Sequence, residues 1–192
     1  MASRTLDRLW LYNYLYPVKK YTDIILTALK GKKFESILEI GCGRCFNLKA
    51  IQEKYPKVKL YGYDNDKNRI EIAQKTKGIT AKVGDITGDI TKETPFKNKK
   101  FDIVFTAAVL IYITPEKIKQ VIRNIKKSAK KELILIEIHS SNSKKFKIYF
   151  IRNYKKLLKE NGFKNIKLKK IPRELWPGLN YKDDGYIISG EL

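Results

Sequence analysis

SILEIGCG, residues 36–43, is the stretch of sequence that decides the fold. Its first five residues form a short, mostly apolar run that predicts a buried strand, and Gly41 and Gly43 follow that run at once. Glycine lets the backbone turn sharply and lets a ligand approach the main chain closely. A helical pattern begins after the turn. The stretch therefore predicts a strand, a glycine turn and a helix whose N-terminal amides face the turn.

Strand and helix patterns alternate along the rest of the chain. The expected strands, after Ser36–Ile40, are Val58–Tyr63, Ile79–Val83, Phe101–Phe105, Leu133–Ile138, Ile166–Lys170 and Tyr186–Ser189. The expected helices are Phe46–Tyr55, Lys67–Lys75, one that starts at Thr114-Pro115, and Tyr149–Glu160. Alternation at this spacing implies right-handed crossovers, whereas the last two strands have no helix between them. We therefore predict an α/β fold, a doubly wound and mostly parallel sheet of about seven strands with a C-terminal antiparallel hairpin.

Length and composition favour a single domain. A chain of 192 residues with 43% apolar content can bury a core but is too short for two full-sized domains. It has no apolar run near the roughly 20 residues that span a bilayer, and its first residues lack the pattern of a signal peptide. We therefore expect a cytoplasmic location.

Cys42 and Cys45 form a C-x-x-C pair inside the glycine turn. Such a pair can be redox-active or can supply half of a zinc site. A zinc site needs further cysteine or histidine ligands, and His139 is the only histidine of the chain. We therefore expect neither a redox role nor a metal site.

The chain is strongly basic, with 41 Lys and Arg residues against 20 acidic ones and a formal charge of +21. Between Ser140 and Arg173 there are twelve basic residues and one acid, Glu160. Only seven of the 41 basic residues are arginine, the side chain that suits bidentate phosphate recognition. The charge is therefore interpreted either as a solvated lysine-rich face or as a surface for nucleic acid or an anionic membrane.

The residues around the glycine turn indicate a cofactor with an adenosine group. Asp64 ends the second expected strand, 21 residues after Gly43, the spacing at which an acidic side chain reaches ribose hydroxyls. Phe46 stands where a dinucleotide-binding turn has its third small residue. Glu39 would repel a pyrophosphate but would attract the ammonium and sulfonium groups of S-adenosylmethionine.

These motifs resemble those of class I S-adenosylmethionine-dependent methyltransferases, from about Phe34 through the C-terminal hairpin. Residues 38–43 look like the first motif of that family, Tyr63-Asp64 like its ribose-binding position, and Phe101–Phe105 like its fourth strand. The resemblance implies S-adenosylmethionine as cofactor and S-adenosylhomocysteine as product. The residues that it implies at the cofactor are Glu39, Gly41, Cys42, Gly43, Asp64, Asn65, Asp85, Ile86, Thr106, Ala107 and Leu110. For the acid near adenine, Asp89 is the alternative to Asp85.

The sequence has fewer signals for the methyl acceptor than for the cofactor. His139 follows the fifth strand, where a base would face the site, but it can equally be a polar strand-end residue. Tyr112 and Glu137 are weaker catalytic candidates. Thr106-Ala107-Ala108-Val109 replaces the Asn/Asp-Pro-Pro-Tyr/Phe sequence that nucleic-acid amino methyltransferases often carry. The sequence therefore favours O- or N-methylation of a small molecule such as a sugar or metabolite; RNA or protein methylation and a non-catalytic binding module are the alternatives.

The N-terminal part is expected to be helical. One helix should end before Pro17, and a second, with its apolar stripe between Tyr21 and Leu29, should end at Gly31. We predict that residues 1–33 form a helical lid and residues 34–192 a Rossmann-like core of one methyltransferase domain. The aromatic residues of the first helix would cover the acceptor pocket or, as the alternative, lie on a membrane.

Overall fold

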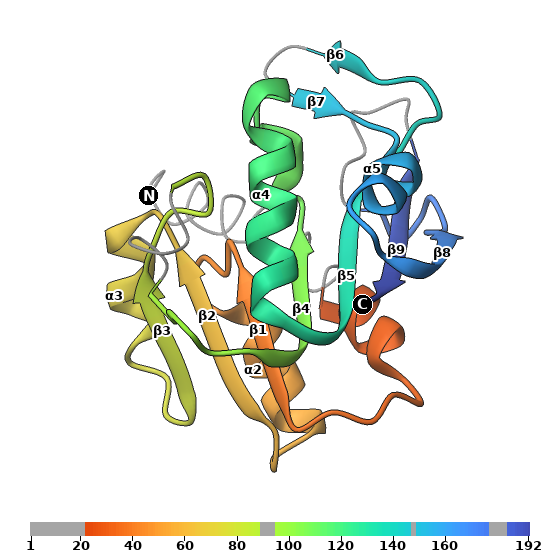
Figure 1. The fold of residues 1–192 in the computed structure, drawn as a ribbon. Helices are drawn as coiled ribbons and strands as arrows, with labels where there is room; N and C mark the ends of the chain where they lie inside the picture. Colours follow the sequence, from red (N-terminus) through yellow and green to blue (C-terminus); the bar gives the residue numbers. More distant parts are fainter. Residues whose placement is uncertain (1–21, 89–94, 147–148, 177–183) are drawn as a thin grey trace, which may run out of the picture.

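The computed structural model describes residues 22–88, 95–146, 149–176 and 184–192. They form a seven-stranded sheet in the order β3-β2-β1-β4-β5-β9-β8 (Figure 1). The strands of the sheet are β1 (Ser36–Ile40), β2 (Lys59–Asp64), β3 (Ile79–Val83), β4 (Phe101–Ala107), β5 (Ala129–Ile138), β8 (Lys164–Lys170) and β9 (Gly185–Glu191). The first five are parallel, and β9 runs antiparallel to both β5 and β8. The predicted doubly wound sheet with a C-terminal antiparallel pair is confirmed.

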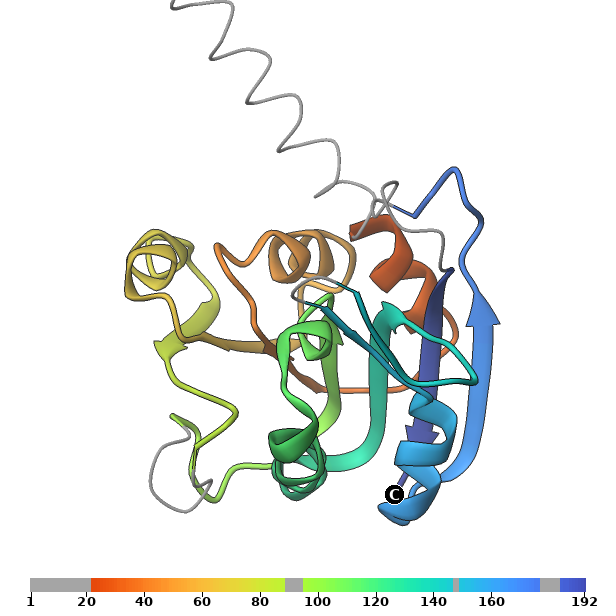
Figure 2. The same ribbon diagram turned by 90° about the horizontal axis from the view of Figure 1, so that it is seen from above.

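Helices cover both faces of the sheet (Figure 2). The helix formed by residues 22–29 lies on one face with α2 (Phe46–Lys54) and α3 (Lys67–Ala73). The other face carries α4 (Pro115–Ser128) and α5 (Tyr154–Glu160). Each face has its own apolar core, with Ile25, Leu48 and Phe105 in one and Val104, Ile122 and Tyr154 in the other. Burial on two faces explains why the central strands are almost continuously apolar.

The carboxyl ends of β1, β2 and β4 meet at one edge of the sheet, the upper edge in Figure 1. The order changes direction at β1, because β2 lies on one side of it and β4 on the other. Ligands of doubly wound sheets bind beyond the strand ends at such a switch point. The fold therefore places the glycine turn after β1 at the expected binding position.

One predicted helix is wrong in its first part. Tyr149–Ile151 is strand β7, which pairs with β6 (Lys144–Phe146) in a separate two-stranded sheet. Helix α5 begins only after Asn153, whose side-chain oxygen accepts a hydrogen bond from the Lys156 amide at 2.9 Å. A capping asparagine fixes a helix start, and the aromatic and β-branched residues before it suit a strand.

The predicted lid concerns mainly residues that lie outside the described part of the chain, 1–21. Residues 22–29 are helical, as the apolar stripe predicted. No helix among the described residues has both the length and the apolar character needed to cross a membrane.

Candidate functional site

The glycine turn after β1 is held against the end of β2. The amides of Gly41 and Cys42 both donate to the carbonyl oxygen of Tyr63, at 2.8 and 3.1 Å. Gly41 and Gly43 have φ angles of 73° and 52°, in the left-handed region that favours glycine. A Cβ atom on Gly41 would lie 2.4 Å from Cγ2 of Val109, so the turn also touches the segment after β4.

Asp64 fixes both the glycine turn and the start of α3. One carboxylate oxygen accepts from the Gly43 amide and the other from the Asp66 amide, each at 2.9 Å. The side chain is buried, and Asp66 in turn caps α3 through the Arg69 amide. A carboxylate has about four acceptor positions, so Asp64 retains capacity for hydroxyl donors of a ligand.

Glu39 is buried beneath the same turn. The side-chain amide of Asn47, in the first turn of α2, donates to one of its oxygens at 2.6 Å. The other oxygen has no hydrogen-bond partner among the described residues. Burial raises the pKa of the Glu39 carboxyl well above its usual value. Glu39 thus joins the end of β1 to the start of α2 across the glycine turn.

The loop after β3 forms a further wall. The Asp85 carboxylate accepts from the amide of Thr87 at 2.8 Å and from its hydroxyl at 2.9 Å. The side chain of Asn124, fully buried on α4, donates to the carbonyls of Ile86 and Gly88, both at 3.0 Å. This loop is therefore held in place by α4. Asp89, the alternative to Asp85, lies outside the described residues.

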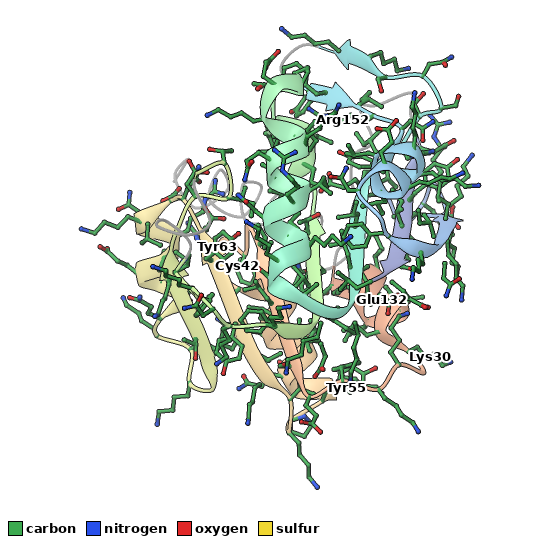
Figure 3. All side chains as sticks on the ribbon, viewed as in Figure 1. Lys30, Cys42, Tyr55, Tyr63, Glu132 and Arg152 are labelled. Atoms are coloured by element: carbon green, nitrogen blue, oxygen red, sulfur yellow. The ribbon has the colours of Figure 1, made fainter. Side chains whose placement is uncertain are left out.

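Two buried side chains hold the segment after β4 (residues 108–113), one through amides of the segment and the other through its carbonyls. One oxygen of Glu137 accepts from the Thr106 hydroxyl and from the amides of Val109 and Leu110, each at 3.0 Å. The Arg152 guanidinium donates to the carbonyls of Leu110 and Phe150, both at 2.8 Å, and to that of Ile113. Figure 3 shows Arg152 near strand β7 and the start of α4. We call this pair the Glu137–Arg152 bracket.

The bracket predicts an unusual pH dependence of stability. Burial raises the pKa of Glu137 from 4.5 to about 7, although its three donors favour the ionised form. A carboxyl whose pKa is raised on folding adds stability below its unfolded pKa, and this contribution is lost as the pH rises through the folded pKa. Wild-type stability should therefore fall between pH 4.5 and 7, by on the order of 3 kcal/mol.

Glu137→Gln should remove that dependence, because an amide does not titrate in this range. Urea unfolding at pH 5, 6, 7 and 8 measures it, with Glu53→Gln as the control at an exposed glutamate. An identical pH profile for wild type and Glu137→Gln would contradict the raised pKa.

These loops enclose a cavity of about 530 Å³, a volume typical of small-molecule sites. It brings together many of the residues predicted at the cofactor. Those that line it are Gly41, Asp64, Asn65, Asp85, Ile86 and Ala107, and Tyr112 lines it too. Five other predicted residues, Glu39, Cys42, Gly43, Thr106 and Leu110, are not part of this lining. Lining residues that were not predicted to contact the cofactor include Tyr63, Arg69, Val109 and Ile113; the Tyr63-Asp64 motif was the sequence signal for the first of them.

The two cysteines are not part of the cavity lining. Both are buried free thiols, and the Cys42 sulfur packs on Gly62, where a Cβ atom would lie 2.7 Å from it. Cys45, with φ of 62°, ends the turn as the N-cap of α2. In the described ranges no three His, Cys, Asp or Glu residues group in a way that could hold a metal ion.

The two residues proposed for catalysis occupy different places. Tyr112 lines the cavity, is 53% exposed, and packs on Tyr149 of β7 with ring centroids 5.3 Å apart. His139 is half-buried, and its Nδ1 accepts a hydrogen bond from the Tyr154 amide at 3.2 Å. Burial and the charge of Lys155 lower the pKa of His139, so the neutral ring carries its proton on Nε2. His139 is not part of the cavity lining.

Comparisons with known proteins agree with this geometry. A family model described as a methyltransferase domain matches residues 37–132. A malonyl-[acyl-carrier protein] O-methyltransferase from Legionella pneumophila is 35% identical over 74 residues, 38% of this chain and 26% of that protein. A probable inactive O-methyltransferase from Dictyostelium discoideum is 27% identical over 130 residues, 65% of this chain and 38% of that protein. The chain thus aligns with less than half the length of these relatives.

A solved structure shares this fold. Magnesium protoporphyrin IX methyltransferase from Synechocystis, with bound S-adenosylhomocysteine, superposes with a TM-score of 0.65 at 15% identity. The match covers 99% of this chain and 95% of the other. The family model spans half of the chain, so the chain belongs to the methyltransferase domain family, and the expected class I fold and S-adenosylmethionine cofactor are confirmed.

Proposed function

We propose that the protein transfers the methyl group of S-adenosylmethionine to a carboxylate oxygen of a small acidic molecule. The observation that carries the proposal is the composition of the cavity. Acidic residues, Asp64 and Asp85, stand on one part of its lining, and Ala107, Val109 and Ile113 make another part apolar. The first part suits hydroxyl and amino groups of an adenosine, and the second suits the methyl group and its acceptor.

The residues fit the cofactor in two further respects. Asp64 keeps free acceptor positions for ribose hydroxyls, and Gly41 lines the cavity with its backbone because it has no side chain of its own. The bound cofactor supplies a methyl group on a positively charged sulfur. We assign Asp64 to the ribose, Asp85 and Ile86 to the adenine, and Gly41 to the methionine part.

An acceptor carboxylate agrees with the titratable groups at the site. In the transfer, a lone pair of the acceptor oxygen forms the new O–CH₃ bond while the S–CH₃ electron pair stays on sulfur. A carboxylate is already ionised at neutral pH, so this acceptor needs no general base. The Nδ1 atom of His139 accepts a hydrogen bond from a backbone amide, and Glu137 is buried in the bracket. Tyr112 and Arg69 line the cavity, so we assign the contacts with the acceptor to them.

Arg69 supplies the complementary charge. It lines the cavity and is 56% exposed, and its Nε lies 3.1 Å from a carboxylate oxygen of Asp66. Tyr112 lines the same cavity; burial raises the pKa of its phenol, and the charge of Arg69 partly opposes that rise. A guanidinium beside the phenol can orient a carboxylate through paired hydrogen bonds. The relative named for malonyl-[acyl-carrier protein] O-methylation also supports an oxygen acceptor.

Asp64→Ala tests the cofactor site. We expect S-adenosylmethionine and S-adenosylhomocysteine to bind about 100-fold more weakly, or by about 2.7 kcal/mol, because the Gly43 and Asp66 amides also lose their acceptor. Titration calorimetry measures the loss, with Asp23→Ala as the control at an exposed aspartate. Full binding by Asp64→Ala, or tight binding of NAD by the wild type, would refute the assignment.

The acceptor is tested by methyl transfer from radiolabelled S-adenosylmethionine to a panel of carboxylic acids, alcohols and amines. Product should form with acids, and its base-labile methyl ester should release methanol on alkaline treatment. Arg69→Gln should raise the KM for the acid more than it lowers kcat. Methylation of amines or alcohols alone would overturn the carboxylate proposal while leaving the methyltransferase assignment intact.

A further inference from the structure

A second cavity, larger than the first, is lined in part by Arg152 of the Glu137–Arg152 bracket. Its volume is about 640 Å³, and its walls come from α4, the β6–β7 hairpin and α5. None of its lining residues lines the cofactor cavity. Arg152 lines the second cavity and donates to the carbonyl of Ile113, which lines the first. The two cavities are therefore separate but share a wall.

The floor of the second cavity is apolar. Ile118, Ile151 and Leu157 are buried and line it from α4, β7 and α5. Phe150 adds a half-buried aromatic ring. Apolar surface that remains open to a cavity favours a ligand whose own apolar part leaves water there.

The rim of the cavity is cationic. Lys119, Lys144, Lys145 and Lys156 line it as exposed side chains, and Glu160 is its one acid among the described residues. Glu160 lies 3.9 Å from Lys156 and balances part of the charge of that lysine. An anion held between several ammonium groups gains charge-assisted hydrogen bonds and relieves their mutual repulsion.

We propose that this cavity binds a soluble amphiphilic anion, a phosphate monoester or carboxylate with a short alkyl chain. The anionic group lies among the lysine ammonium groups, and the alkyl chain covers Ile118, Ile151 and Leu157. The volume accommodates one such molecule. The site is additional to methyl transfer, because no residue of the cofactor cavity takes part in it.

The ligand chemistry is tested by titration calorimetry with octyl phosphate, inorganic phosphate and 1-octanol on the whole chain. We expect octyl phosphate to bind at one site per chain, at least about tenfold more tightly than either of the other two. Such a result would show that tight binding requires both the phosphate charge and the alkyl chain of the ligand. Equal affinity for octanol, equal affinity for inorganic phosphate, or no saturable binding of octyl phosphate would each overturn the proposal.

The location is tested by a pair of charge reversals. Lys119→Glu with Lys156→Glu should weaken octyl phosphate binding by about tenfold or more. Lys57→Glu with Lys75→Glu is the matched control, since these exposed lysines lie elsewhere and the net charge changes equally. Circular dichroism should show both variants folded. Unchanged affinity in the first pair, or equal losses in the two pairs, would overturn the location.

Discussion

Replacing Gly41 with alanine should abolish S-adenosylmethionine binding, with an affinity loss of at least about 100-fold. The added Cβ would lie 2.4 Å from Cγ2 of Val109, and atoms cannot remain that close. Either the glycine turn or the segment after β4 must move. Both line the cofactor cavity, so either movement changes the position of groups that contact the ligand. Titration calorimetry on the folded variant measures the loss.

Gly31 provides the matched control for this substitution. It also has a left-handed φ, 78°, but a Cβ atom there would meet nothing within 4 Å. Gly31→Ala therefore reports the backbone cost of alanine at positive φ, about 1–2 kcal/mol, without the collision. Adding Val109→Ala to Gly41→Ala should restore part of the binding, because the two colliding methyl groups are gone. Equal affinities of Gly41→Ala and Gly31→Ala would contradict the steric explanation.

The glycine turn and its neighbours could be predicted from sequence because their signals are local. The 21-residue spacing from Gly43 to Asp64 predicted an acidic side chain at the ligand site beside the turn, and in the fold the Gly43 amide donates to the Asp64 carboxylate. Likewise, Thr114-Pro115 predicted the start of α4 because proline suits the first helical position. Both features depend on short segments whose patterns act before any tertiary packing is known.

The Glu137–Arg152 bracket could not be predicted in the same way. Arg152 stands in the most basic tract of the chain, where a solvated charge is the ordinary interpretation, yet it is only 7% exposed. Its partners, Leu110 and Ile113, lie 42 and 39 residues earlier and offer backbone carbonyls, which have no sequence signature. The β6–β7 hairpin that places Arg152 was missed for a related reason. Its residues also fit a helical stripe, and only the Asn153 cap separates the two patterns.

Arg152→Met should cost about 3–5 kcal/mol of the free energy of unfolding and should also lower methyl transfer. Methionine keeps much of the side-chain volume but leaves the carbonyls of Leu110, Ile113 and Phe150 without their donor. Hydrogen bonds to a charged group stabilise a fold more than neutral ones, so the loss of several buried ones lowers the free energy of unfolding strongly. Urea unfolding near pH 7 gives the stability, and the methyl-transfer assay gives KM and kcat.

Two further variants separate the loss of the Arg152 hydrogen bonds from a nonspecific loss of stability. Arg152→Lys keeps the charge but not the planar fork, so it should recover only part of the lost stability. Arg123→Met removes an exposed arginine of α4 whose guanidinium donates to the Gln120 side chain at 2.8 Å, and it should change the free energy of unfolding by no more than about 0.5 kcal/mol. The bracket also holds Tyr112 in the cavity wall, so Arg152→Lys should raise the acceptor KM more than the Kd for S-adenosylmethionine. Equal losses in the Arg152 and Arg123 variants would show that the guanidinium does not hold this segment.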